Sequence, residues 1–294
     1  MPVATARFTA HSLAKPTRLD ATLKKQYPGW GRQAVQRLIG SGKVRLNGRV
    51  VKLSSWEVNN GDRLEILDPP ADKVAAPIAW DDAWLIADEP DLVAVNKPAG
   101  LLSEAPRFSP TGNLLDLAKA RFGPVILFHR LDRDTSGVVI LTRPGPVNKY
   151  LDAAFKSHSV RKEYLAVVTQ PNQLDASGTI DAYLGPHPQR RDQMAVVTRG
   201  GQKAVTNYQI EVTDKQRQLV RLFPQTGRTH QLRVHLAHLG APILGDRLYG
   251  PQPPKHPRLL LHAEQIHLPS AEGYPERTFT AELPRGFWPL TPSF

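Results

Sequence analysis

A stretch with neither helix nor strand periodicity, DPPADKVAAPIAWDD at 68–82, divides the chain into two unequal parts. Its Pro, Ala and Asp residues are typical of a linker rather than of a packed element. We therefore expect a small domain at 1–67, a linker at 68–83 and a large domain at 84–294. The length of 294 residues suits this division, because it exceeds one typical domain and falls short of three.

Positive charge is concentrated in the first part of the chain. The whole sequence has a formal net charge of +11, and residues 1–67 hold 12 Lys and Arg against 4 Asp and Glu. Such a cluster neutralises phosphates and releases their counterions, so it predicts a nucleic-acid-binding module. The alternative is a solvated basic surface without a partner.

The first part has the pattern of two short helices followed by a small sheet. We expect the helices at 18–27 and 31–40. Asn47-Gly48 is a strong hairpin signal, and a further strand is expected at 63–67. Basic side chains around the second helix and the hairpin could grip an RNA backbone through phosphate contacts. They are Arg32, Arg37, Lys43, Arg45 and Arg49.

The second part combines many strands with a few helices, which predicts an α+β fold. Helices are expected at 146–157 and 229–239, the second ending before Gly240. Short apolar runs and one alternating segment predict strands. These lie at 92–95, 125–128, 138–141, 161–169 and 218–223.

Composition excludes several classes of protein. The chain has no cysteine, so disulfides and thiolate catalysis are excluded. The first residues lack the apolar core of a signal peptide, and no apolar run approaches the roughly 20 residues that span a bilayer. We therefore expect a cytoplasmic protein without membrane contact.

The segment HRLDRDTSG at 129–137 lies between two apolar runs and predicts a loop held on a rigid scaffold, where catalytic groups tend to lie. The flanking cations Arg130 and Arg133 should keep Asp132 ionised and available as a nucleophile or a base. Surface ion pairs are the alternative for such a loop. A weaker alternative takes Asp132 and Asp134 as magnesium ligands.

Two further segments carry candidate functional groups. Strand alternation puts Lys162 and Tyr164 on one face, where the tyrosine ring could meet a base or simply pack in the core. Arg233 lies in the first turns of the helix at 229–239, where a cation opposes the helix dipole and favours a carboxylate partner. His230, His235 and His238 lack the spacing of a helical metal site, and we discount that interpretation.

The first part resembles the RNA-binding domain named after the small-subunit ribosomal protein S-four. The similarity rests on RLD at 18–20, on RQAVQRLIGSGKVRLNG at 32–48 and on GD at 61–62.

The second part resembles the RluA family of pseudouridine synthases. The motifs are HRLDRDTSG, the segment from Lys162 to Tyr164, and GRTHQLRVHLAHLGAPILGDRLYG at 227–250. NKPAG at 96–100, KAVTNY at 203–208 and RLLLHA at 258–263 extend the similarity over about 91–287.

This resemblance implies a fold and a chemistry. The fold is a mixed, largely antiparallel central sheet with flanking helices. Asp132 matches the family's catalytic aspartate, Tyr164 its active-site tyrosine, and Arg233 the arginine that pairs with that aspartate. Arg130 matches an arginine that fills the gap left by a flipped base. The implied reaction isomerises uridine in RNA and needs no redox cofactor and no metal.

The expected partner is RNA, and the S-four-like domain favours large-subunit ribosomal RNA over tRNA. We expect a monomer. A non-catalytic RNA-binding or ribosome-assembly factor would be expected to lose one of the three matched residues, and a metal-dependent nuclease would need a chelatable ion. The sequence departs from the family at LLSEAP, 101–106, where His-Pro is frequent, and at Gln193, where Lys is common.

Overall fold

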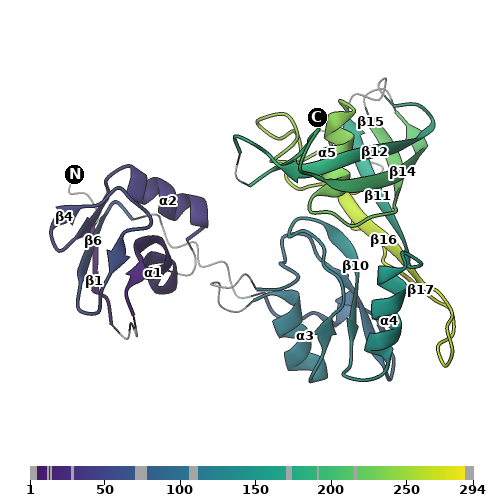
Figure 1. Ribbon diagram of the computed structural model, residues 1–294, viewed down its shortest axis with the longest axis horizontal. Helices are drawn as coiled ribbons and strands as arrows, with labels where there is room; N and C mark the ends of the chain where they lie inside the picture. Colours follow the sequence, from purple (N-terminus) through teal and green to yellow (C-terminus); the bar gives the residue numbers. More distant parts are fainter. Residues whose placement is uncertain are drawn as a thin grey trace. The chain divides into compact units, whose positions relative to one another are not determined.

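The computed structural model describes residues 5–11, 13, 15–27, 30–69, 78–105, 112–169, 174–190, 192–214 and 217–288. The chain divides into two compact units, one of Met1–Ala79 with Ala105–Gly112 and one of Trp80–Glu104 with Asn113–Phe294 (Figure 1).

Part of the expected linker at 68–83 belongs to the second unit. Residues 70–77 lie outside the described part of the chain, and Asp82–Trp84 forms a short 3-10 helix, η1. Trp80 packs edge-on against Trp84 and Phe122, with ring centroids 5.6 and 5.0 Å apart. Packing of the second unit therefore includes Trp80, ahead of the start that we expected at 84. The domain limits otherwise remain a prediction.

The first unit packs two helices against a four-stranded sheet. The helices are α1 (Leu19–Gln26) and α2 (Arg32–Gly40), close to the predicted ranges. The sheet has the order β1-β6-β3-β4. Its strands are β1 (Thr5–Thr9), β3 (Val44–Leu46), β4 (Arg49–Val50) and β6 (Arg63–Leu67), and β2 (Thr17–Arg18) pairs separately with β5 (Glu57–Val58).

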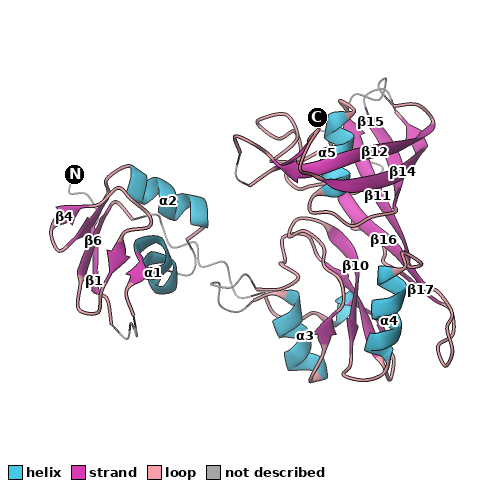
Figure 2. Cartoon of the chain, in the orientation of Figure 1, coloured by secondary structure: helices cyan, strands magenta, loops and turns pink. Residues whose placement is uncertain are grey.

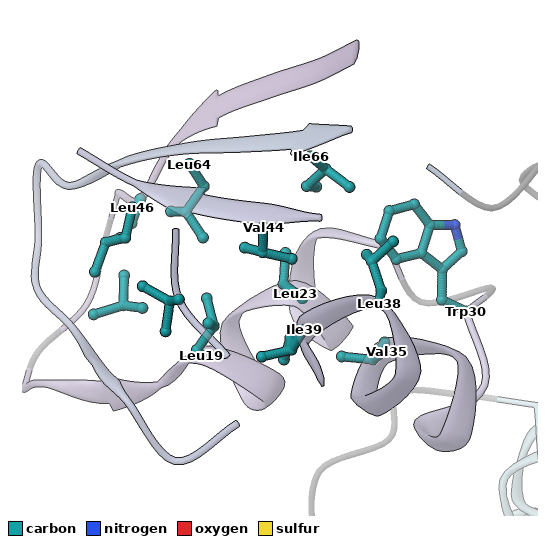
Figure 3. Packing of buried hydrophobic residues seen from close by; sticks show 13 residues of the cluster. Leu19, Leu23, Trp30, Val35, Leu38, Ile39, Val44, Leu46, Leu64 and Ile66 are labelled. Carbon is teal, nitrogen blue, oxygen red and sulfur yellow. The ribbon is translucent and has the colours of Figure 1, made fainter. Parts of the chain in front are cut away.

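Helical spacing places the apolar residues of α2 on one face. Val35, Leu38 and Ile39 are buried and pack against the sheet residues Val44 and Ile66 (Figure 3). The hairpin signal is also confirmed, since Asn47 and Gly48 have φ values of 49° and 81° between β3 and β4. Both positive angles are those of the tight turn that Asn-Gly favours.

The second unit is built on one large sheet, to which eleven strands of the described part contribute (Figure 2). The path is β13-β12-β14-β15-β11-β16-β10-β8-β7, with β17 added to β16 and β9 to β10. The strands on the side of β10 are β7 (Leu85–Asp88), β8 (Leu92–Lys97), β9 (Ile126–Leu127), β10 (Ser136–Thr142), β16 (Leu261–Leu268) and β17 (Arg277–Thr280). Those on the other side are β11 (Arg161–Thr169), β12 (Ser177–Pro186), β13 (Met194–Val196), β14 (Gln202–Thr213) and β15 (Arg217–Pro224).

Helices cover both faces of the sheet near β10. Every residue of β10 is buried, and successive side chains enter different cores. Val138 and Ile140 pack with α4 (Val147–Lys156), while Val139 and Leu141 pack with α3 (Leu114–Phe122). The third helix, α5 (Gln231–His238), packs through Leu232 and Leu236 against β11 and β15. None of the helices described is long and apolar enough to cross a lipid bilayer.

The only parallel pairing among these described strands joins β10 to β16, and it is short. It pairs Ser136 with His262 and Gly137 with Ala263. Gly137 has a φ of 120°, and a Cβ atom at this position would lie 2.1 Å from the Ala263 carbonyl oxygen. Only glycine therefore allows the two strands to approach in this way. The loop that carries Asp132 ends directly before this crossing.

Candidate active site

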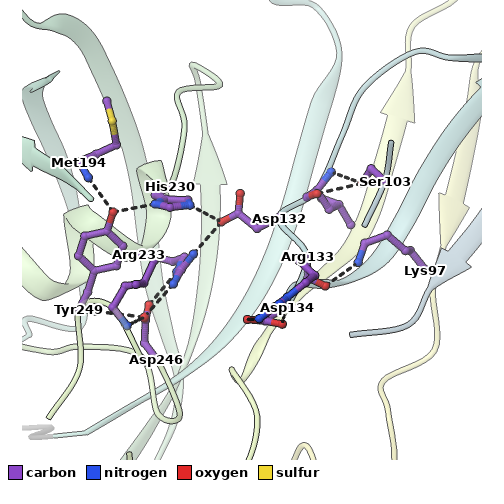
Figure 4. A network of polar contacts seen from close by, with 12 residues as sticks. Lys97, Ser103, Asp132, Arg133, Asp134, Met194, His230, Arg233, Asp246 and Tyr249 are labelled. Carbon is purple, nitrogen blue, oxygen red and sulfur yellow. Dashed lines mark hydrogen bonds and ion pairs between the residues drawn. The ribbon is translucent and has the colours of Figure 1, made fainter. Parts of the chain in front are cut away.

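The loop between β9 and β10 holds Asp132 between two anchored neighbours (Figure 4). The Ser103 hydroxyl donates to the Leu131 carbonyl at 2.9 Å and accepts from the Leu131 N–H at 3.1 Å. On the other side, the Arg133 carbonyl accepts from Lys97 Nζ at 3.1 Å and from the Gly100 N–H at 2.8 Å. The backbone at Asp132 is thus tied to the segment 97–103 on both sides.

Lys97 makes this anchor with a fully buried side chain. Its Nζ also donates to the carbonyls of Pro98 at 3.0 Å and Leu101 at 2.7 Å. Burial lowers the pKa of Lys97 to about 7, and the charges of Asp134 and Asp132 oppose this shift. Three acceptors match the three N–H bonds of an ammonium group, so the geometry suits the charged form.

The charge partner of Asp132 comes from a distant element. Arg233 on α5 places Nη1 3.1 Å from Asp132 Oδ2. Arg233 is itself buried in the first turn of α5, where a cation opposes the helix dipole. The carboxylate that such a position favours is therefore present, 101 residues away in the sequence.

Asp246 binds the same guanidinium at the nitrogens that do not contact Asp132. Its two carboxylate oxygens accept from Arg233 Nε and Nη2, both at 2.8 Å, and Oδ1 also accepts from the N–H groups of Leu248 and Tyr249. Burial raises the pKa of Asp246, but the hydrogen bonds and charge of Arg233 outweigh it and hold that pKa below its usual value. Our sequence reasoning missed Asp246, although GDRLYG lay within a quoted motif.

His230 adds a neutral group beside the carboxylate. Its Nε2 lies 3.8 Å from Asp132 Oδ2, and its Nδ1 lies 2.7 Å from the Tyr249 hydroxyl. The Met194 N–H donates to that hydroxyl at 2.9 Å, so His230, Tyr249 and Met194 form one hydrogen-bonded chain. Burial lowers the pKa of His230 despite the nearby Asp132 charge, so the ring is neutral at pH 7.

A pocket of about 370 Å³ opens beside Asp132. Lys162 and Tyr164 both line it, in keeping with the face that strand alternation assigned to them. Tyr164 is half-buried, and burial followed by the Asp132 charge raises its pKa. Tyr164 therefore keeps its proton at neutral pH. The Lys162 ammonium lies 5.9 Å from the ring centroid of Phe155, which also lines the pocket.

The two arginines that flank Asp132 have other partners. Arg130 pairs with Glu104 at 2.9 Å, and Arg133 pairs with Asp134 at 3.0 Å. Our expectation that they provide the charges next to Asp132 is wrong, because both guanidinium groups pair with other carboxylates. Arg130 nevertheless lines the pocket with Asp132.

Both segments that depart from the family pattern make defined contacts in the structure. In LLSEAP, Ser103 anchors Leu131 and Glu104 pairs with Arg130. Gln193 donates from Nε2 to the Leu248 carbonyl at 2.7 Å, beside Tyr249.

The basic residues of the first unit differ in their surroundings. Arg37, Arg45 and Arg49 are exposed, whereas Lys43 pairs with Asp68 at 2.6 Å. The side chain of Arg32 lies outside the described residues.

Two family models match the chain. Residues 91–238 match RNA pseudouridylate synthase, and residues 17–64 match the S4 domain. The first range lies within the resemblance stated over about 91–287, and the second spans the motifs at 18–62.

Similar proteins carry related names. "Ribosomal large subunit pseudouridine synthase D" of Haemophilus influenzae is 30% identical over 247 residues, which cover 81% of this chain and 75% of that protein. The protein of the same name from Escherichia coli is 31% identical over 249 residues, covering 81% of this chain and 74% of the relative. The solved structure "Human RNA Pseudouridylate Synthase Domain Containing 4" aligns with a TM-score of 0.57 at 31% identity, over 70% of this chain and 90% of that one.

An anchored loop carboxylate with an arginine partner beside a pocket, the two family matches and these relatives all agree with the sequence resemblance. The chain therefore belongs to the RNA pseudouridine synthases of the RluA family, enzymes that isomerise uridine in RNA, and carries an S4 RNA-binding domain ahead of the catalytic unit.

Proposed function

We propose that Asp132 is the catalytic carboxylate of this enzyme, that Arg233 positions it, and that Tyr164 stacks on the target uracil. One observation carries this assignment. The Asp132 carboxylate is held by Arg233 at 3.1 Å, at the wall of a pocket that Tyr164 also lines. A flat ring and an oriented carboxylate in one pocket suit a base and the sugar attached to it.

The reaction explains why a carboxylate is needed. The bond from ribose C1′ to uracil N1 breaks, the base turns, C1′ bonds to C5, and the C5 proton leaves as N1 gains one. Cleavage develops positive character at C1′, which a nearby carboxylate can stabilise or capture, as in glycoside hydrolysis. Attack at carbon and removal of a sugar proton both require Asp132 to contact the sugar.

The uridine has to leave its RNA stack to reach Asp132. Flipping a base costs a few kcal/mol, which binding elsewhere on the RNA has to offset. Arg130 lies at the pocket and is exposed, so its side chain can enter the gap that the base leaves. The basic residues of the S4 domain, Arg32, Arg37, Lys43, Arg45 and Arg49, would contribute phosphate contacts.

We infer that the substrate is large-subunit ribosomal RNA. The names of the relatives from Haemophilus influenzae and Escherichia coli support this target, and so does the S4 domain. A tRNA is the alternative substrate. Such an enzyme would work in the cytoplasm, where ribosomal RNA is made and folded.

Mapping of pseudouridine across all cellular RNA tests the target. A strain that lacks the gene should lose pseudouridine at one or a few positions of large-subunit RNA, and the wild-type gene should restore them. A gene encoding Asp132→Asn should not restore them. Loss confined to tRNA would contradict the ribosomal assignment and leave the catalytic one intact.

A further inference from the structure

A second and larger pocket lies on the other side of the catalytic loop. Its volume is about 580 Å³, and Arg133 and Asp134 line it, whereas Asp132 lines the smaller pocket. Figure 4 shows the side chains of Arg133 and Asp134 paired with each other and turned away from the Asp132 carboxylate. One short loop thus forms part of the wall of both pockets.

Arg258 lines this second pocket without a carboxylate partner. Within the described part of the chain, its guanidinium donates to the Leu259 carbonyl and the Ser136 hydroxyl, at 3.3 and 3.1 Å, and makes no ion pair. Burial lowers the pKa of Arg258, yet an arginine stays charged in proteins. A half-buried cation that lacks a counter-charge is costly, so an anion in the pocket would stabilise it.

The other charges of the pocket leave this cation uncompensated. Arg133 and Asp134 pair with each other, and the Lys97 ammonium already serves three carbonyl groups. Arg247 is exposed and donates only to the Pro257 carbonyl among the described residues, while Glu282 is exposed at the same pocket. The pocket therefore contains two arginines without a carboxylate partner among the described residues, Arg247 and Arg258, and one exposed carboxylate, Glu282.

We propose that this second pocket binds a phosphodiester group of the substrate RNA, next to the nucleotide that enters the Asp132 pocket. A guanidinium is suited to phosphate because its N–H groups match two phosphate oxygens. The volume exceeds that of a phosphate, and Trp84 and Pro98 give the pocket an apolar wall for a ribose or a base. The inference rests on the RNA-directed activity of the family and not on the ribosomal target.

The salt dependence of RNA binding tests the proposal. The probe is any RNA stem-loop from which the wild-type enzyme releases tritium at C5 of uridine, so an error about the ribosomal target does not affect the result. In the double variant Arg247→Gln/Arg258→Gln, the slope of log affinity against log salt should fall by about 1.4, because each lost contact to a single strand removes about 0.7. Affinity near 0.15 M salt should fall about ten-fold, and kcat/KM with it.

The matched control removes two cations that line neither pocket, in Lys119→Gln/Arg217→Gln, and should keep the wild-type slope. Arg258→Lys retains the charge and should keep most of the RNA affinity that Arg258→Gln loses. If Arg258→Gln fails to fold, Arg247→Gln alone changes an exposed side chain and should lower the slope by about 0.7. A wild-type slope in the Arg247 and Arg258 variants would overturn the proposal.

Inorganic phosphate provides a second probe that separates the sources of the anion. Its binding to the full-length protein is followed by phosphorus NMR. Phosphate binding that is lost in Arg247→Gln/Arg258→Gln together with an unchanged RNA slope would assign the pocket to a free anion and overturn the RNA assignment. Failure of the Asp132 assignment would instead appear as tritium release by Asp132→Asn, with the slopes unaffected.

Discussion

Asp246 grips Arg233 through two hydrogen bonds of 2.8 Å, and the remaining guanidinium nitrogen, Nη1, reaches Asp132 at 3.1 Å. A planar guanidinium held at two nitrogens has little freedom to turn, so Asp246 determines where the third one points. Asp246 in turn is held by two backbone N–H groups of the GDRLYG turn. The orientation of the Asp132 carboxylate therefore depends on a buried residue that lines neither pocket.

Asp246→Asn should impair catalysis more than RNA binding. Loss of the buried charge partner leaves Arg233 poorly oriented, and a small misplacement of Asp132 can cost about 100-fold in rate. We also expect a loss of about 3 kcal/mol in the free energy of unfolding, since a buried cation loses its counter-charge. Single-turnover tritium release and urea unfolding measure the two effects.

Combining Asp246→Asn with Arg233→Ala separates positioning from general damage. If Asp246 acts through Arg233, the double variant should be no slower than Arg233→Ala alone. Rate losses that multiply would contradict this arrangement.

Asp132→Asn should abolish isomerisation and leave RNA affinity unchanged or higher. The substitution keeps the size of the side chain and removes one negative charge beside the RNA phosphates. Asp152→Asn, in an exposed i,i+4 pair with Lys156, is the matched control and should release tritium normally. Near-normal release by Asp132→Asn would show that another group performs the chemistry.

Tyr164→Phe should retain RNA affinity within about two-fold, because the ring that stacks is kept. If the hydroxyl takes part in proton transfer at C5, the chemical step should slow by about 100-fold or more. Tyr183→Phe changes an exposed tyrosine that lines neither pocket and serves as the control. An unchanged single-turnover rate would reduce Tyr164 to a stacking surface.

Lys97 should make stability depend on pH in one direction. Its pKa is lowered to about 7 in the folded protein, whereas an unfolded lysine titrates near 10.4. Between these values the unfolded state binds one more proton, so the free energy of unfolding should rise with pH, by up to about 1.4 kcal/mol per unit. Below pH 7 both states are protonated, so this lysine no longer makes the free energy of unfolding change with pH.

Urea unfolding of the wild type and of Lys97→Met at pH 6.5, 8 and 9.5 measures the effect as a difference, which cancels the other titrating groups. The stability of the wild type relative to the variant should increase from the first pH to the last. Parallel profiles would mean that the three carbonyl groups keep the ammonium charged throughout.

The basic face of the S4 domain should act mainly through phosphates. Arg37→Gln, Arg45→Gln and Arg49→Gln together should lower the salt slope by about 2 to 3 and weaken binding to all RNA sequences alike. Turnover at saturating RNA measures whether the catalytic unit is affected separately. An unchanged slope would remove this face from the binding surface.

Local sequence signals predicted the elements that have a strong hydrophobic periodicity or a specific turn sequence. The helices α4 and α5, the strand β10 and the Asn47-Gly48 hairpin all lie close to where the sequence indicated. Each of them is specified by residues within a few positions of one another, so no knowledge of distant partners was needed.

Other elements depend on partners far along the chain. The strand β1, TARFT, has an ordinary local sequence and exists because it pairs with β6, which begins 58 residues after Thr5. The long strand β14 is largely polar, and its sequence alternates apolar residues only in the second half, at Tyr208, Ile210 and Val212. The arginine next to Asp132 could be assigned only through the family resemblance, because the adjacent arginines have the right charge but point elsewhere.

The short parallel contact between β10 and β16 makes the pairing of Asp132 with Arg233 sensitive to the alignment of the sheet. Asp132 lies directly before β10, whereas Arg233 and Asp246 belong to the elements packed on β11 and β15. Only two residue pairs join β10 to β16, and Gly137 is one of the four residues involved. Sliding β10 along β16 by a single residue, about 3.3 Å, would separate Asp132 from Arg233. The same slide would disturb an apolar core, because Val138 and Ile140 of β10 pack with Ile266 and Leu268 of β16. The alignment of Asp132 with Arg233 is therefore protected by the packing that joins the two halves of the sheet.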